Sequence, residues 1–318
     1  NYGIADNNTY IHPCFYFKHS DNYYVALASS FNKITNKIIN KWLTATNPFT
    51  DDWVPIHAGN TDDLADLLPD TYNTFNEITG ICKKHNGDST YITAVGIGKS
   101  NFGSISKIAL LEYNEDLTHR RLILPDLSGY TFNIGMSSIG YGITYAFYKG
   151  KHLISLVDGN HNTGKGIVLS SNRLDGPYTL HSTIYNWTED AWLTLNESPF
   201  KTSIASISLL VYNSELYAAT SGQPSDVKTG LSAKHQMYLW KYSDAESTWN
   251  LTVAPFIMAL HGNRFDYPEL EEDFGFAHLG TTSFGLLDGN KLWLNYKGKD
   301  SGGYQGTIGY IDLDKALS

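Results

Sequence analysis

SSIGYGITYAFY, residues 137–148, is joined by the turn KGK to the run HLISLVDG, residues 152–159. Both runs are rich in the β-branched and aromatic residues that favour strands, and a short polar turn between such runs is typical of a β-hairpin. Two further runs of strand length follow, GKGIVLSSN at 164–172 and GPYTLHSTI at 176–184. The whole stretch therefore predicts one antiparallel sheet of four strands in chain order.

The same layout recurs in four other segments of the chain. Their first runs are IHPCFYF at 11–17, NEITGICKK at 76–84, SIASISLLVY at 203–212 and AHLGTTSFGLL at 277–287. Asn86-Gly87 and Asp288-Gly289 are strong turn signals for two of the hairpins. Five antiparallel units of roughly 45 to 65 residues are typical of the blades of a β-propeller, in which four-stranded sheets surround a central axis.

We therefore predict a single all-β domain, residues 1–318, folded as a five-bladed β-propeller. The blades are expected near residues 7–57, 72–125, 135–185, 200–255 and 275–318. The fifth unit lacks a clear fourth strand, and the N-terminal segment Asn1–Asp6 could supply it and close the ring, which would cover exposed sheet edges. A β-sandwich with strands of similar length is the alternative fold.

The composition excludes several classes of protein. Of the 318 residues, 42% are hydrophobic, 14% aromatic and only 17% charged, which is unlike a disordered chain. The net charge is −9 and no basic run occurs, so we do not expect nucleic-acid binding. No apolar stretch approaches the roughly 18 residues of a membrane span.

Two carboxylates are the predicted catalytic groups. In a propeller the first strands of all blades converge on the axis, so that polar residues at their starts share one pocket. A glycosidase needs a pair of carboxylates, one as acid and one as base or nucleophile. Glu77 and Glu197 are the expected pair because they belong to different blades and would face each other across the axis, with Asp273 in reserve. A structural role is open for each, such as an ion pair of Glu77 with Lys83.

Five further residues are predicted to bind substrate. His12, Tyr141 and His278 fall at or before the first strands, and Trp187 and Trp192 lie in the long connection NWTEDAWLTLNES. An aromatic ring can stack on the apolar face of a pyranose while polar groups bond its hydroxyls. Packing in the core is the structural alternative for the two tryptophans.

Three motifs resemble the five-bladed glycosidases of the arabinanase and β-xylosidase type. HPCFYFKHSDNYYVALASS, residues 12–30, resembles their opening blade, and SSNRLDGPYTL, residues 170–180, resembles their link between outer strands. NESPF, residues 196–200, resembles their Glu-x-Pro acid motif, which implies that Glu197 is the general acid. The sequence departs from the family in two places: His12-Pro13 stands where Asp-Pro would stand, and NESPF precedes the fourth unit, not the third.

These observations predict a glycoside hydrolase that cleaves a bacterial or plant polysaccharide. One alternative is a glycan-binding propeller without turnover. Another is a polysaccharide lyase, with His12, Tyr141 and His278 available for proton abstraction beside a uronate carboxylate.

Cofactor, location and assembly are predicted only in outline. We expect no cofactor, although the many Asp and Asn oxygens leave a structural calcium open. A composition rich in Asn, Ile, Tyr and Lys is similar to that of bacteriophage tail spikes and other secreted glycan-active proteins. That similarity implies an extracellular or virion-surface location and a place in a larger or trimeric assembly.

Overall fold

A computed structural model describes the residues of about three fifths of the chain. They are residues 9–20, 23–32, 37–46, 54–55, 74–75, 82–84, 89–98, 107–116, 118–132, 143–158, 165–184, 201–225, 236–257, 283–288, 290–300 and 303–318.

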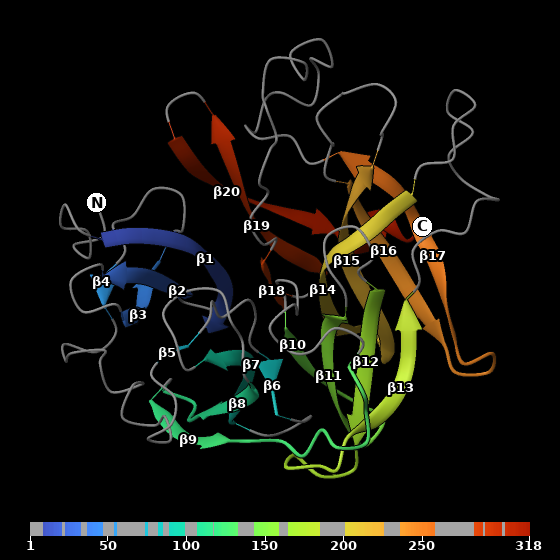
Figure 1. Cartoon of the computed structure of the whole chain (residues 1–318). Coiled ribbons are helices and arrows are strands. Elements are labelled where there is room, and N and C mark those ends of the chain that lie inside the picture. Colours follow the sequence, from blue (N-terminus) through green and yellow to red (C-terminus); the bar gives the residue numbers. More distant parts are fainter. Residues whose placement is uncertain are drawn as a thin grey trace.

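The described strands form five antiparallel sheets, and each sheet is built from one continuous part of the sequence (Figure 1). Sheet A contains β1 (Thr9–Ser20), β2 (Tyr23–Asn32), β3 (Lys37–Ala45) and β4 (Val54–Pro55). Sheet B contains β5 (Thr74–Phe75), β6 (Cys82–Lys83), β7 (Tyr91–Gly98), β8 (Lys107–Tyr113) and β9 (His119–Ile123). Sheet C contains β10 (Thr144–Tyr148), β11 (Lys151–Asp158), β12 (Lys165–Ser171) and β13 (Thr179–Ile184).

Sheets D and E complete the described part of the chain. Sheet D contains β14 (Lys201–Tyr212), β15 (Glu215–Ser225), β16 (Gln236–Ser243) and β17 (Thr248–Ile257). Sheet E contains β18 (Ser283–Asp288), β19 (Lys291–Asp300) and β20 (Gly303–Asp312), and the one-turn helix α2 (Leu313–Ala316) follows it. The expected all-β class is confirmed.

Tight turns join the first two strands of sheets C and D. Lys149 and Gly150 have φ of 46° and 80°, and Asn213 and Ser214 have φ of 49° and 62°. Positive φ at both central residues of a two-residue loop is the geometry whose twist matches that of a hairpin. Both turns lie at polar positions that the sequence marks as turns.

The sheets pack face to face, so that sheet C is covered on both sides. On one face, Ile154 and Leu156 of β11 belong to an apolar cluster with Leu110 of sheet B. On the other face, Leu153 and Val157 pack in a cluster with residues of sheet D such as Trp240. Burying a side chain of this size stabilises the fold by about 1.5–3 kcal/mol.

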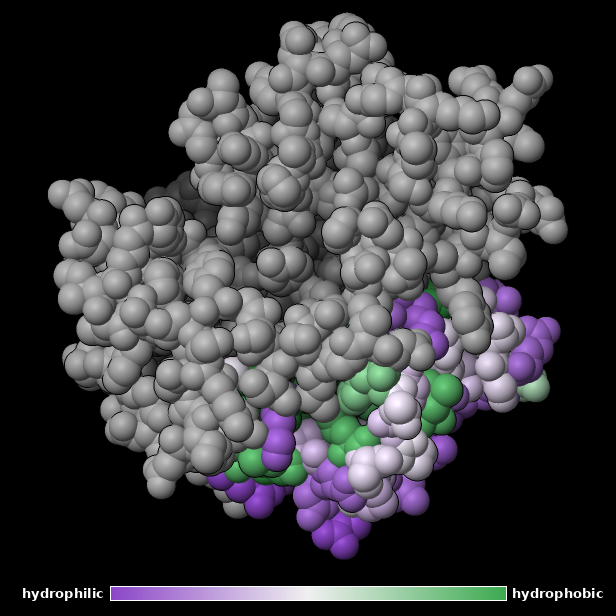
Figure 2. All heavy atoms as spheres, in the orientation of Figure 1, coloured by the Kyte–Doolittle hydropathy of each residue, from purple (hydrophilic) through white to green (hydrophobic). Residues whose placement is uncertain are grey.

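The other face of sheet D carries a third apolar cluster. Leu210 and Leu239 of sheet D pack there with Leu292 of sheet E and Leu313 of α2. Hydrophobic and hydrophilic residues are interspersed over the described part of the face in Figure 2. Among the described residues the exposed large apolar side chains are Leu124 and Leu180, and isolated apolar side chains of this kind are normal on a surface.

The first strand of each sheet lies at the contacts between sheets. Strand β10 contacts β6 and β7 of sheet B and β14 of sheet D, while β18 contacts β14 and β1. Strands β3 and β5 join sheets A and B. The last sheet therefore contacts the first as well as the fourth. The number of blades and the closing role predicted for Asn1–Asp6, which lies outside the described residues, remain proposals.

Candidate functional site

Most of the predicted site residues fall in parts of the chain that the structure does not describe. Outside the described residues lie Glu77, Tyr141, Trp187, Trp192, Glu197, Asp273 and His278. His12 lies in β1, where the backbone pairing is described but the side chain is not. The structure therefore describes the strands next to these positions in sequence, and not the predicted side chains themselves.

The first strands of sheets A, D and E each carry an extra residue relative to the second strand of the same sheet. A bulge falls at Pro13–Cys14 in β1, at Ala205 in β14 and at Gly285–Leu286 in β18, and each of these lies in the first half or at the midpoint of its strand. Strand β1 has a second register shift, between Lys18 and Ser20, at its other end. A bulge tolerates Pro13 because proline has no N–H to donate to the ladder.

In sheet B the first strand is in two parts that differ in register. Phe75 of β5 pairs with Ile97 and Cys82 of β6 pairs with Ile92, so the register of β6 is offset by two residues from that of β5. In sheet C the described pairing of β10 with β11 is regular from Thr144–Ser155 to Tyr148–Lys151.

The bulges of β1, β14 and β18 and the register offset between β5 and β6 thus fall toward the end at which the chain enters the sheet, here called the entry end. Bulges are over-represented beside active sites because they re-aim side chains. The entry end is also where the predicted residues cluster in sequence: His12 precedes the bulge of β1 directly, and Glu77 falls between β5 and β6. The entry end is therefore the candidate functional site.

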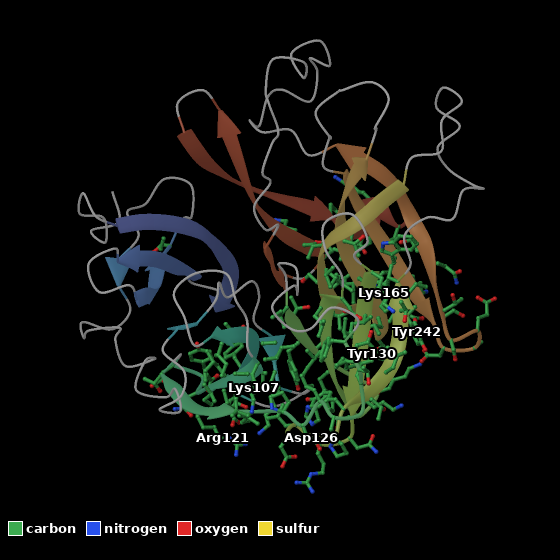
Figure 3. The ribbon with its side chains drawn as sticks, in the orientation of Figure 1. Lys107, Arg121, Asp126, Tyr130, Lys165 and Tyr242 are labelled. Atoms are coloured by element: carbon green, nitrogen blue, oxygen red, sulfur yellow. The ribbon has the colours of Figure 1, made fainter. Side chains whose placement is uncertain are left out.

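A buried carboxylate that sequence reasoning missed lies at the entry end of sheet C. Asp158, the last residue of β11, is 2% exposed, and its Oδ2 accepts a hydrogen bond of 2.7 Å from the Tyr130 hydroxyl. Tyr130, labelled in Figure 3, belongs to the connection between β9 and β10. A buried carboxylate is costly unless it is hydrogen-bonded. The sequence feature that indicates Asp158 is an acidic residue at the end of an apolar run, directly before Gly159.

Two buried hydroxyls join sheets C and D at the start of β10. The Thr144 and Ser155 hydroxyls are 2.6 Å apart, and the Leu209 backbone N–H of β14 donates to Thr144 Oγ1 at 2.9 Å. These bonds satisfy a backbone group on the edge of β14, which would be costly to leave unpaired. They hold the first strands of two sheets together beside the entry end.

The opposite ends of the sheets carry ion pairs. Glu112 is fully buried, with Lys84 Nζ at 2.9 Å and Arg121 Nε also bonded to its carboxylate. Burial alone would raise the pKa of Glu112, but the hydrogen bonds from Lys84 and Arg121 bring that pKa below its ordinary value. Asp244 likewise accepts hydrogen bonds from Tyr148 at 2.6 Å and Lys149 at 2.7 Å. These contacts join strands and sheets at the ends opposite the entry end. We therefore assign them a structural role and keep the entry end as the candidate site.

In the described ranges, no three His, Cys, Asp or Glu side chains gather as they would around a metal ion. Nor does any helix in that part of the chain have the length and hydropathy required to cross a bilayer. The structural calcium that the sequence leaves open stays a prediction.

The sequence matches no protein-family model and no curated protein, whereas solved structures match the fold. An exo-β-1,3-galactanase from Clostridium thermocellum has a TM-score of 0.57 at 10% identity over 96% of this chain, which spans 60% of that protein. A structure from a mannoside phosphorylase family that contains hydrolases of β-1,2 mannosidic linkages in Candida mannan has a TM-score of 0.55 at 12% identity, over 96% of this chain and 89% of its own. The catalytic domain of an α-L-arabinofuranosidase from Coprinopsis cinerea has a TM-score of 0.51 at 12% identity, over 94% and 89%.

These solved structures are propeller glycosidases that differ in the sugar their names give. At identities of 10–12% the likeness concerns the fold alone. The chain is thus an all-β protein with the fold of this enzyme type.

Proposed function

We propose that this chain is a glycoside hydrolase with a five-bladed β-propeller fold that cleaves a polysaccharide at the entry end of its sheets. The observation that carries the proposal is the irregular ladder of the first strands in four of the five sheets, bulged in β1, β14 and β18 and offset between β5 and β6, toward the end where the predicted site residues cluster in sequence. The likeness of fold to glycosidases that act on different sugars supports the class of reaction and leaves the sugar open.

Glu77 and Glu197 are the proposed catalytic pair, with Asp273 in reserve. Glu77 lies in sequence between β5 and β6, and Glu197 precedes β14 by four residues. The strands that follow them in sequence, β6 and β14, belong to different sheets, and both contact β10. In this mechanism one carboxylic acid protonates the leaving oxygen, and the other carboxylate activates water or attacks the sugar. Glu197 takes the acid role that its Glu-x-Pro motif implies.

The proposed sugar-binding groups are His12, Tyr141, His278, Trp187 and Trp192. The aromatic rings would stack on pyranose faces, and the histidines would bond hydroxyls. Their separation along the sequence suits a pocket built from several sheets.

The test is incubation with a panel of bacterial and plant polysaccharides, read by new reducing ends. E77Q and E197Q should each lower kcat at least about 100-fold, since general acid–base catalysis contributes about 10²–10⁴, while glycan binding and the melting temperature are kept. E115Q, which changes an exposed acid in the turn after β8, is the control. Full activity in both E77Q and E197Q contradicts the proposed mechanism.

A glycan-binding module without turnover is the second candidate, and one feature of β1 favours it. His12-Pro13 stands at the bulge, where the glycosidases that this segment resembles begin with Asp-Pro, so a carboxylate is missing at that position. Retention of a polysaccharide on size-exclusion without new reducing ends would establish this candidate. A gain of unsaturated-uronate absorbance would instead indicate the lyase.

An extracellular or virion-surface location and a larger or trimeric assembly belong to the same proposal, and composition alone supports them. Light scattering on the purified chain measures the assembly directly. A trimer would triple the 35.4 kDa mass of one chain.

A further inference from the structure

The pair formed by half-buried Tyr130 and buried Asp158 lies where sheets B and C meet at the entry end. Asp158 shares a strand face with Ile154 and Leu156, since alternate residues of a strand point to one side. The side chains of Ile154 and Leu156 belong to the apolar cluster between the sheets, and Tyr130 packs against the same cluster. A third apolar residue would suit this position, yet the sequence places a carboxylate there.

Tyr130 belongs to the connection that leads from sheet B into the first strand of sheet C. That connection is fixed along β13 by a hydrogen bond of 2.8 Å from the Tyr178 N–H to the Asp126 carbonyl and by a bridge between Gly129 and Thr179. The Tyr130 hydroxyl then reaches from this outer edge of the sheet to the end of β11. Phe132 stands edge-on to the Tyr130 ring, with centroids 5.0 Å apart.

We propose that Asp158 is a positioning residue: through Tyr130 it anchors the connection whose continuation enters β10, and it thereby sets the geometry of the entry end. The inference rests on the proposed function, because the geometry of the entry end matters for turnover only if the entry end is the active site. Asp158 is too deeply buried to touch a substrate, so it acts through Tyr130. A misplacement of about 1 Å in a catalytic site can cost about 100-fold in rate, which is the scale of effect that anchoring can have.

The chain offers a closely matched control for this pair. Tyr148, at the other end of β10, donates a hydrogen bond of 2.6 Å to Asp244 of sheet D. The change Y148F therefore removes the same kind of bond, between a tyrosine and an aspartate of neighbouring segments, away from the entry end. Y148F should lose less stability than Y130F, because Asp244 is partly exposed and keeps its bond from Lys149 whereas Asp158 is buried, and an effect on the site should be confined to Y130F.

The experiment compares kcat, KM and melting temperature for the full chain and its variants on a polysaccharide that the wild type cleaves. We expect Y130F and D158A to lower kcat about 10- to 100-fold with KM changed less, and Y148F to stay within about twofold. D158N should recover most of the turnover, because its carboxamide oxygen still accepts the Tyr130 hydroxyl. This rescue also keeps the test decisive if Y130F fails to fold. Equal turnover in Y130F and Y148F, or a D158N as poor as D158A, overturns the inference.

Failure of the proposed function is separable from failure of this inference. A wild type that neither cleaves nor retains any polysaccharide contradicts the function, and amide hydrogen exchange then decides the anchoring. Y130F should speed exchange in residues 127–132 and at the end of β11, and Y148F should leave those amides unchanged. Equal protection of those amides in wild type and Y130F overturns the anchoring.

Discussion

His181 shows how one extra residue in a strand places a titratable group between sheets. The register of β12 and β13 shifts between the pairs Val168–Ser182 and Leu169–Leu180, which leaves His181 as the extra residue. Its ring lies against Tyr242 of sheet D, with centroids 4.9 Å apart. Its Nδ1 is 3.1 Å from the Ser182 hydroxyl, which accepts the Trp249 indole N–H at 2.9 Å. The bulge thus inserts an imidazole into the junction of sheets C and D.

The pH dependence of stability should report this junction. Burial holds the pKa of His181 below its ordinary 6.5, Lys151 lowers it further and Asp244 opposes the shift. The folded state therefore favours the neutral ring, and this stability is present above pH 6.5 and is lost as the pH falls through the lower folded pKa. Between pH 7.5 and 5, the melting temperature of the wild type should fall about 1–2 °C more than that of H181Q, a small effect because the ring is partly solvated. Calorimetry measures both, and an equal fall in the two proteins contradicts the prediction.

Glu112 is a second residue whose charge the fold depends on. E112Q removes the charge that Lys84 and Arg121 share, but both cations are partly exposed and water can take over some of the bonding. We therefore expect a loss of about 2 kcal/mol in unfolding free energy, within the range for hydrogen bonds to charged groups. Because the folded pKa of Glu112 lies below 4.5, this stability is present above pH 4.5 and is lost as the pH falls through the folded pKa.

Urea unfolding at pH 7 measures this loss. E115Q, in the exposed turn that follows β8, is the control and should change the unfolding free energy by less than about 0.5 kcal/mol. Equal stabilities of E112Q and E115Q would show that the buried ion pair contributes nothing net.

At the scale of elements, the one-turn helix α2 is held by its neighbours and not by its own length. A single turn is not stable alone, because nucleation is unfavourable. Asp312 caps α2, Asn290 Nδ2 donates to Asp312 and Asp314 at 3.0 Å each, and the Tyr212 hydroxyl also binds Asp314. Leu313 is fully buried in the cluster that joins sheets D and E.

L313A should therefore destabilise the whole domain. Removing a fully buried leucine side chain costs about 2–5 kcal/mol, since a cavity is left behind. Leu317 only partly packs against the same cluster, so L317A should cost clearly less. Urea unfolding of the two variants gives the comparison, and equal losses would mean that Leu313 does not fasten α2 to the sheets.

The sequence predicts hairpins better than it predicts their irregularities. The turns at Lys149-Gly150 and Asn213-Ser214 fall where polar residues interrupt two apolar runs. The bulges are not predictable in this way, because a one-residue slip is visible only when polar and apolar residues alternate, and a strand such as β7 is buried along its whole length. Asp158 was missed because its partner Tyr130 is 28 residues away in sequence. Glu77, Glu197 and the other predicted site residues remain predictions.

For the whole molecule, packing between sheets is continuous from sheet B through sheet E. Apolar clusters join B to C, C to D, and D to E with α2, and β1 contacts both β18 and β19. Sheet E has three strands among the described residues, whereas A, C and D have four each. A fourth strand from Asn1–Asp6 would give sheet E the same number of strands as A, C and D and tie the two ends of the chain together.

Closure of the ring by the N-terminal segment can be tested at one position. Proline lacks an N–H and blocks a sheet ladder, so I4P should prevent Asn1–Asp6 from adding to β20. We expect I4P to lower the free energy of unfolding by about 1–3 kcal/mol, because an edge of sheet E loses its partner and the ends of the ring separate. I4V keeps the N–H and the β-branched side chain and should remain within about 1 kcal/mol of the wild type.

Urea unfolding followed by circular dichroism and by tryptophan fluorescence should also change for I4P from one transition to two, since an open ring no longer couples the first and last sheets. I4P and I4V of equal stability, each with a single transition, would show that Asn1–Asp6 does not close the ring.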